Sequence, residues 1–253
     1  MIDIRKNIDV KDLTTFGVSA FCNYFTEVFT LEELNEALNF AKENELPLLF
    51  LGGGSNVLFT RPFKGVAIKV SLKGKKEENA DDNYVWVSVQ AGEKWDEFVS
   101  YCIDKGYGGL ENLSLIPGNA GTSPMQNIGA YGVEIKDTFH SLQALNIKTR
   151  EVETFTNESC RFGYRESFFK NEGKNAYVIL QVIFKLTRKN HILNTSYGVI
   201  QEELNKKNIT QPTLRDIREV VIGIRKSKLP DPEILGNAGS FFKNPTISLQ
   251  EFT

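Results

Sequence analysis

The sequence predicts an α+β fold, because stretches with apolar residues at helical spacing alternate with short apolar runs of strand length. Two glycine-rich loops lie between these elements. The chain has 253 residues, of which 41% are hydrophobic, so it can form one large domain or two smaller ones with substantial cores. We find no internal repeat and no low-complexity tract.

The N-terminal part is predicted to be a small β-α-β-type unit. A helix is expected from Thr30 to Glu45, and Thr30 forms a capping box with Glu33. The apolar face of this helix comprises Leu31, Leu34, Ala37, Leu38 and Ala41. Residues 47–51 are predicted to form a buried strand that runs directly into a glycine loop, and residues 67–70 a second strand.

The middle of the chain is predicted to begin with a charged surface loop at 73–83, which is a plausible subdomain boundary. A strand is expected at 84–89, followed by a helix. One face of that helix carries Trp95, Phe98, Val99, Cys102 and Ile103. Residues 106–132 are too long and too rich in Gly, Pro, Asn and Ser for an ordinary connector, so we expect this loop to be functional.

The remaining elements are expected, in chain order, as a hairpin about Arg150 (142–149 and 152–155), a strand (176–186), a short helix (197–204), a longer helix (213–226) and a hinge (229–232). The longer helix is the clearest of these. Its apolar face comprises Leu214, Ile217, Val220, Val221 and Ile224.

Composition excludes several classes of function. The net charge of -2 gives no general attraction to nucleic acid or to anionic membranes, and no segment approaches the roughly 20 apolar residues needed to span a bilayer. Cys22, Cys102 and Cys160 are too scattered for a disulfide framework or a zinc site. His140 and His191 lack metal-type partners, so we expect no metal. The N-terminus has no apolar signal core, which predicts a cytoplasmic protein.

The two glycine-rich loops are the first candidate site. Gly52, Gly53, Gly54, Ser55 and Asn56 follow a strand, and their backbone amides are suited to a pyrophosphate. The spacing matches neither G-x-G-x-x-G nor a P-loop, and a tight structural turn is an equally good explanation of this loop alone. Residues 117–132 (PGNAGTSPMQNIGAYG) offer many polar groups and little bulk, which favours binding of a polar cofactor over a purely structural loop.

A second candidate site combines an arginine and a serine. Arg165 lies among aromatic residues and is suited to hold a carboxylate through its guanidinium fork, although a solvated arginine or an ion pair with Glu166 is the simpler explanation of that motif alone. Ser240 lies in the glycine-bracketed segment 236–245 (GNAGSFFKNP), where small neighbours allow a ligand to approach its hydroxyl. Arg225 and Lys228 near the hinge could meet phosphates, or could simply be the basic last turn of a helix.

The combined motifs resemble the UDP-N-acetylenolpyruvoylglucosamine reductase family of flavoenzymes, which function in peptidoglycan synthesis. The matching blocks are TTFGV (14–18), LGGGSNVLF (51–59), GLENLSLIPGNAGTSPMQNIGAYGVE (109–134), CRFGYRESFFK (160–170), KLPDP (228–232) and GNAGSFFKNP (236–245). They occur in order along the whole chain, so the set is far more specific than any one block.

The resemblance implies noncovalent FAD on a fold of the vanillyl-alcohol-oxidase (PCMH) type, with NADPH as reductant and a UDP-sugar as substrate. It implies an FAD-binding α/β subdomain at 1–72, a second FAD-binding α+β subdomain at 73–225, and the beginning of a truncated substrate-binding domain at 226–253. It also implies a monomer that needs neither nucleic acid nor membrane.

The resemblance further assigns residues. It makes Ser240 the proton donor and Arg165 a catalytic residue at the substrate carboxylate. Residues implied to bind the cofactor are Gly52, Gly53, Gly54, Ser55, Asn56, Pro117, Gly118, Gly121, Thr122, Ser123, Gln126, Asn127, Ile128, Gly132 and Arg225. Residues implied to contact the substrate are Tyr131, Tyr197, Lys228 and Asn244, with Tyr197 covering it as in the longer, type I form.

One departure from the family pattern matters for activity. The family pattern continues past the position of Thr253 and includes a catalytic glutamate that has no counterpart here, which predicts impaired turnover. Two alternatives stay open. The chain is then either another FAD oxidoreductase of the same fold or a nucleotide-binding module without catalysis.

Overall fold

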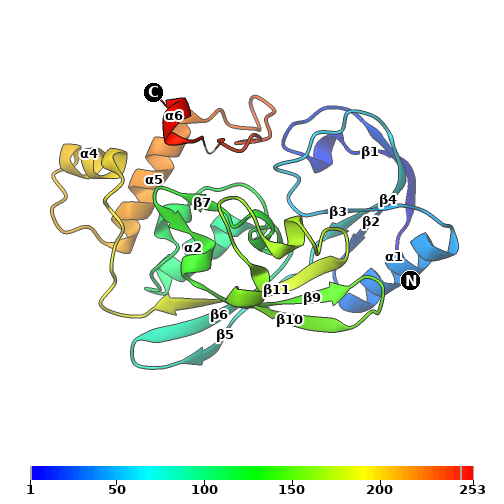
Figure 1. Ribbon diagram of the computed structural model, residues 1–253, viewed down its shortest axis with the longest axis horizontal. Helices are drawn as coiled ribbons and strands as arrows, with labels where there is room; N and C mark the ends of the chain where they lie inside the picture. Colours follow the sequence, from blue (N-terminus) through cyan, green and yellow to red (C-terminus); the bar gives the residue numbers. More distant parts are fainter. Residues whose placement is uncertain (1, 246, 253) are drawn as a thin grey trace.

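The computed structural model describes residues 2–245 and 247–252 and contains two main sheets with helices packed around them (Figure 1). The first sheet has four strands in the order β1-β2-β4-β3. They are β1 (Arg5–Asp9), β2 (Phe21–Val28), β3 (Leu48–Leu51) and β4 (Phe63–Val70). β1 pairs antiparallel with β2, whereas β4 runs parallel to both β2 and β3.

Helix α1 (Leu31–Glu43) packs on the first sheet, as the sequence predicts. The Thr30 hydroxyl accepts a hydrogen bond from the amide of Glu33, but the Glu33 carboxylate accepts from Phe29 rather than closing the predicted box onto Thr30. No strand is predicted from the residue pattern at 5–9 or 21–28. The second of these is an inner strand of the sheet, and its polar residues interrupt the apolar pattern that would have identified it.

The second sheet has five antiparallel strands in the order β10-β9-β11-β6-β5. They are β5 (Lys75–Ala80), β6 (Tyr84–Gln90), β9 (Phe139–Asn146), β10 (Val152–Thr156) and β11 (Tyr177–Thr187). The prediction of a surface loop at 73–83 is wrong, because Lys75–Ala80 forms the edge strand of a hairpin that projects from the sheet (Figure 1). All of its residues are exposed, so pairing with β6 needs no apolar pattern.

Three helices complete the main architecture: α2 (Trp95–Asp104), α4 (Gly198–Lys206) and α5 (Leu214–Lys228). Every residue predicted for the apolar faces of α2 and α5 is buried. The shorter elements are η1 (Lys11–Leu13), η2 (Glu111–Leu113), η3 (Ala120–Thr122), η4 (Pro124–Gln126), β7 (Gly129–Ala130), β8 (Val133–Glu134), η5 (Ile135–Asp137), α3 (Asn157–Cys160), η6 (Phe168–Lys170) and α6 (Leu249–Phe252).

One apolar core joins the two sheets. It contains Leu34, Leu38, Val66 and Ile68 of the first unit together with Leu145, Val178 and Leu180 of β9 and β11. A second core fills the space between the five-stranded sheet and α2, and a third lies between α4 and α5. The division of the chain after residues 72 and 225 stays a prediction.

The cysteines are free and buried. Burial raises the pKa of the Cys160 thiol to about 12 and also raises the pKa of the Cys102 thiol, so both stay protonated at neutral pH. Across residues 2–245 and 247–252, no three or more His, Cys, Asp or Glu side chains are grouped to hold a metal ion. In the same residues no helix has both the length and the apolar content to cross a bilayer.

Candidate active site

The two glycine-rich loops meet backbone to backbone. A Cβ atom added to Gly53 would lie 2.9 Å from the Cα atom of Gly118, and one added to Gly52 would lie 2.6 Å from Cγ2 of Thr122. Real Cβ atoms do not adopt these distances, so the backbone contact needs glycine at position 53, and a Cβ atom at position 52 would require the Thr122 side chain to shift. The structure thus brings together the two loops that the sequence singles out.

Backbone amides converge where these loops touch. In the described part of the chain, no protein group accepts a hydrogen bond from the amides of Gly53, Gly54, Ser55 and Asn56, or from those of Gly118 and Asn119. Gly54 adopts a φ of +63° and is buried, so its amide needs a partner. Such a group of free donors is suited to bind the diphosphate of a dinucleotide. The residues at this contact therefore fit FAD.

Several side chains predicted to bind the cofactor instead shape the second loop. The Thr122 hydroxyl donates to the carbonyl of Asn119 (2.8 Å), and the Ser123 hydroxyl donates to that of Ala120 (2.7 Å). Asn127 adopts a φ of +43°, donates from Nδ2 to the carbonyl of Gly163 and accepts at Oδ1 from the amide of Lys136. Their role in the structure is to fix the loop backbone.

The other predicted residues of this loop have different surroundings. The amide of Gly121 donates to the carbonyl of Ala91 (3.0 Å), and Ile128 packs against the core of the five-stranded sheet. Pro117 is exposed, whereas Gly132 is held at a φ of +80°. The side chains of Ser55 and Gln126 form no hydrogen bond with the described residues and therefore remain available to a ligand.

Arg165 stabilises the second loop through hydrogen bonds. Its Nη2 donates to the carbonyl of Gly129 (2.6 Å) and its Nη1 to that of Asn127 (3.5 Å), while the guanidinium lies 5.6 Å from the ring centre of Tyr164. These bonds occupy two of the five N–H donors of the guanidinium, so the rest stay available for an anion. The predicted alternative, an ion pair with Glu166, is not formed, because Glu166 pairs with Lys243.

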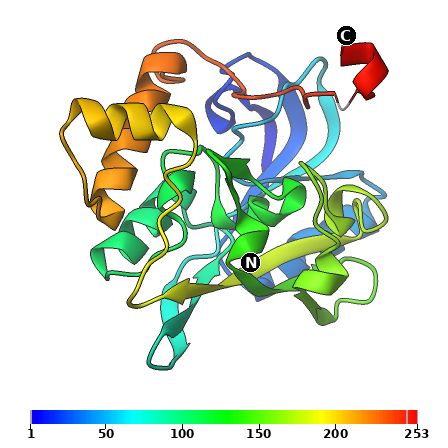
Figure 2. The same cartoon turned by 60° about the vertical axis from the view of Figure 1, so that its left-hand side comes forward.

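The segment that carries Ser240 is docked against the first glycine loop. Asn237 exchanges two hydrogen bonds with Thr15, one at 3.0 Å through its amide and one at 2.7 Å through its carbonyl. The side chain of Asn56 donates to the carbonyl of Ala238 (3.0 Å). Figure 2 shows this segment running from α5 across to the N-terminal sheet.

Ser240 is therefore held near the site by its neighbours while its own side chain is free. It is exposed, and its hydroxyl makes no hydrogen bond among the described residues. Further along the segment, Lys243 pairs with Glu166 at 3.0 Å, next to Arg165 in sequence. The structure thus links the serine segment both to the first glycine loop and to the turn that presents Arg165.

Two of the predicted substrate tyrosines also meet. The rings of Tyr131 and Tyr197 pack edge to face with centres 5.5 Å apart. Burial raises the pKa of Tyr131, although a hydrogen bond from Arg225 acts in the opposite direction. Asn112 donates both N–H groups of its side chain, to the carbonyls of Tyr131 (3.1 Å) and Asn194 (2.9 Å).

Two predicted substrate contacts have free side chains. Lys228 and Asn244 are exposed, and neither side chain makes a hydrogen bond or ion pair with the described residues. Sequence reasoning also missed two residues that organise the site, Thr15 and Asn112. Both lie inside the motif blocks quoted above, but no spacing rule distinguishes a side chain that binds a neighbouring backbone from an ordinary surface group.

Comparisons with known proteins show the family to which the chain is related. Residues 23–155 match the family described as FAD binding domain. A UDP-N-acetylenolpyruvoylglucosamine reductase from Flavobacterium johnsoniae is 54% identical over 252 residues, which cover 99% of this chain and 74% of that protein. The chain belongs to the UDP-N-acetylenolpyruvoylglucosamine reductase family. It is accordingly a flavin-dependent oxidoreductase, and the resemblance stated from the motifs is confirmed.

Solved structures support the fold of the vanillyl-alcohol-oxidase type. The reductase of this family from Thermus caldophilus covers 97% of this chain and 76% of its own, with a TM-score of 0.68 at 23% identity. A solvent-stable cholesterol oxidase covers 74% of this chain and 38% of its own, with a TM-score of 0.55 at 14% identity. The predicted α+β FAD-binding fold is thus confirmed.

Proposed function

We propose that the chain binds FAD noncovalently, accepts reducing equivalents from NADPH and reduces UDP-N-acetylglucosamine enolpyruvate to UDP-N-acetylmuramate. The observation that carries this proposal is the docking of the Ser240 segment on the first glycine loop through Thr15 and Asn56. That docking places a free hydroxyl beside the loops that offer unpartnered amides to a cofactor.

The residues at the loop contact would hold the cofactor. Amides of Gly53, Gly54 and Gly118 would donate to its diphosphate, with Ser55 and Gln126 as further polar contacts. When bound, FAD supplies hydride chemistry that no protein side chain provides. The chain itself would orient the substrate and manage charge and protons.

The reduction adds a hydride at C3 and a proton at C2 of the enolpyruvyl double bond. Negative charge develops at C2 and spreads into the adjacent carboxylate, and we assign its stabilisation to the free N–H groups of Arg165. We assign Ser240 as the donor of the proton to C2. A serine hydroxyl is a weak acid, so this role requires a strongly basic acceptor and fixed geometry.

Tyr131 and Tyr197 would close the substrate side of the site. Tyr197 is 50% exposed, which suits a residue that covers a bound ligand. Lys228 and Asn244 are the free polar side chains that we assign to the sugar nucleotide, since a phosphate or sugar hydroxyl would supply the partners that they lack.

Visible spectroscopy tests the proposal. Purified protein reconstituted with FAD is expected to show a flavin spectrum that bleaches when NADPH is added anaerobically. The enolpyruvyl sugar nucleotide is then added. Recovery of the spectrum would mean that both half-reactions run, whereas bleaching without recovery would contradict the proposed reduction of the enolpyruvyl substrate. A protein that binds no FAD, or binds it but is not reduced by NADPH, would overturn the proposed function.

A further inference from the structure

Leu115 has a backbone conformation that its side chain disfavours. Its φ is +57°, in the left-handed region where a residue other than glycine pays a steric cost. It lies at the entrance to the second glycine loop, three residues before Gly118. A strained residue at that place persists only if its surroundings hold it.

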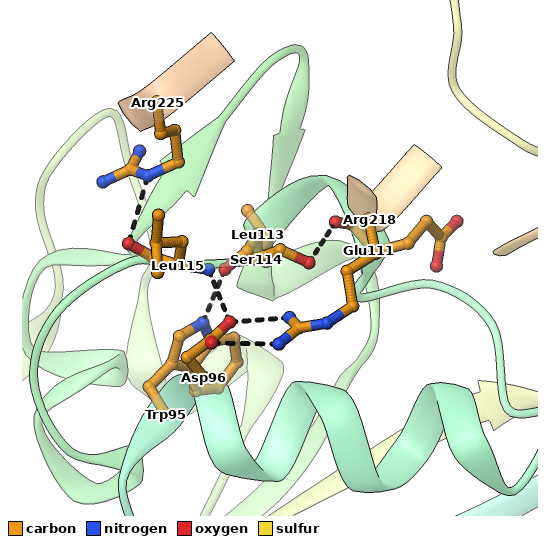
Figure 3. A network of polar contacts seen from close by, with 8 residues as sticks. All are labelled: Trp95, Asp96, Glu111, Leu113, Ser114, Leu115, Arg218 and Arg225. Atoms are coloured by element: carbon orange, nitrogen blue, oxygen red, sulfur yellow. Dashed lines mark hydrogen bonds and ion pairs between the residues drawn. The ribbon is translucent and has the colours of Figure 1, made fainter. Parts of the chain in front are cut away.

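An ion pair between two helices holds the amide of Leu115. That amide donates to Oδ1 of Asp96 (2.5 Å), at the start of α2. The Asp96 carboxylate in turn receives both arms of the Arg218 guanidinium, at 2.6 and 3.0 Å (Figure 3). Only 16% of the Arg218 side chain is exposed, so water screens this bidentate pair weakly.

The carbonyl of Leu115 is held from the same side. Nε of Arg225 donates to it at 3.1 Å, and Arg225 lies two turns after Arg218 on α5 (Figure 3). The indole of Trp95 donates to the carbonyl of Leu113 (2.9 Å), which fixes the preceding turn. Both hydrogen-bonding groups of Leu115 are therefore anchored by side chains, the amide by Asp96 of α2 and the carbonyl by Arg225 of α5.

We propose that Arg218 is a positioning residue for the cofactor loop. By orienting Asp96 it holds Leu115 in the left-handed conformation, and this sets where the free amides of Gly118 and Asn119 point. The inference rests on the proposed role of those amides as ligands of FAD. It predicts that loss of the Arg218 guanidinium weakens FAD binding even though Arg218 is not among the groups that we assign to the cofactor.

Helix α5 supplies a matched control. Arg215 also bridges α5 to α2, pairing with Asp104 at 3.0 Å, but both members of this pair are more than half exposed and neither side chain forms a hydrogen bond with the loop. FAD is titrated into apo-protein and the Kd is read from flavin fluorescence. Arg218→Met is expected to raise the Kd roughly tenfold or more, and Arg215→Met to change it by less than about twofold.

A second substitution separates positioning from general destabilisation. Leu115→Gly in the Arg218→Met background should bring the Kd back towards the wild-type value, because glycine adopts a positive φ without being held there. A loop that was merely destabilised would gain nothing from added flexibility. If Arg218→Met does not fold, Arg218→Lys replaces it, with a rise of several fold expected because one ammonium cannot reproduce the fork.

Two results would overturn the inference alone: equal Kd values for Arg218→Met and Arg215→Met, or no recovery of affinity with Leu115→Gly. A wild-type protein that binds no FAD at all would be a different failure. It would remove the proposed function as well as this inference.

Discussion

At the scale of single residues, the site is organised by side chains that bind the backbone. Leu115, Tyr131 and Arg165 all adopt φ values between +51° and +57° although none is glycine. Leu115 and Tyr131 are held through backbone hydrogen bonds to side chains of other segments. Arg165 donates a hydrogen bond from its own side chain to another segment. Much of the site's polar chemistry is therefore used to maintain loop conformation, which leaves the free amides and Ser240 for ligands.

The proton-donor assignment predicts a selective defect. Ser240→Ala should leave reduction of the bound flavin by NADPH nearly unchanged, because that step needs no proton from the serine. It should slow reoxidation by the enolpyruvyl sugar nucleotide by roughly 10²–10⁴-fold, the usual contribution of a positioned acid. Anaerobic stopped-flow absorbance measures both steps, and equal slowing of the two would contradict the assignment.

The contact between the loops predicts intolerance of a single methyl group. Gly53→Ala would press a Cβ atom against Gly118 at 2.9 Å, so the loops must separate and FAD affinity should fall by roughly tenfold or more. Gly223→Ala is the control. Its Cβ atom would meet nothing within 4 Å, and in α5 it should stabilise the protein by about 0.5–1 kcal/mol. FAD titration and urea unfolding measure the two effects, and wild-type affinity in Gly53→Ala would refute the steric argument.

At the scale of elements, Asn112 connects η2 to the turn at Tyr131 and to the segment before α4. An isosteric Asn112→Asp substitution would turn two donors into acceptors that face carbonyl oxygens. We expect a loss of about 1–3 kcal/mol in the free energy of unfolding. Asn83→Asp, at an exposed side chain without a hydrogen bond, should change it by less than about 0.5 kcal/mol. Urea unfolding distinguishes these outcomes. Equal losses of unfolding free energy in the two variants would mean that the hydrogen bonds of Asn112 do not contribute measurably to stability.

The ion pair between Asp96 of α2 and Arg218 of α5 predicts that the free energy of unfolding depends on pH. Burial opposes ionisation of Asp96, but hydrogen bonds from Arg218 and the amide of Leu115 outweigh it and lower its pKa below 3.8. A carboxyl with a lowered folded-state pKa contributes stability above its unfolded pKa and loses that contribution as pH falls through the folded value. Wild type should exceed Asp96→Asn in unfolding free energy by about 1 kcal/mol at pH 7. The gap should hold to about pH 5 and close below about pH 4. A gap that persists unchanged at pH 3 would contradict this account.

Elements with strong periodicity were predictable, whereas those without it were not. The apolar faces of α2 and α5 follow directly from residue spacing, and all of their predicted members are buried. Strand β5 has only exposed residues, and β2 mixes polar and apolar ones, so neither carries a period that marks a strand. The glycine loops were recognisable from composition, but their contact at Gly53 and Gly118 depends on how distant segments pack.

At the scale of the whole molecule, bound FAD should stabilise the folded chain, because the amides that we assign to its diphosphate come from both sheet units. FAD at about 100 times its Kd contributes about 2.7 kcal/mol. For a chain of this length that is a rise in Tm of roughly 5–10 °C. FMN is the control, since it lacks the diphosphate that the free amides would bind. Thermal unfolding followed by circular dichroism measures the shift, and equal shifts with FAD and FMN would argue against the diphosphate site.

The apolar core that joins the sheets also determines what a cut in the chain would do. Leu145, Val178 and Leu180 pack with Leu34 and Val66, so neither unit covers its own hydrophobic surface. Cleavage in the exposed hairpin after β5 would therefore yield a nicked but tightly associated complex, like two subunits of an obligate heterodimer. The halves would come apart only on denaturation, and each alone would be prone to aggregate.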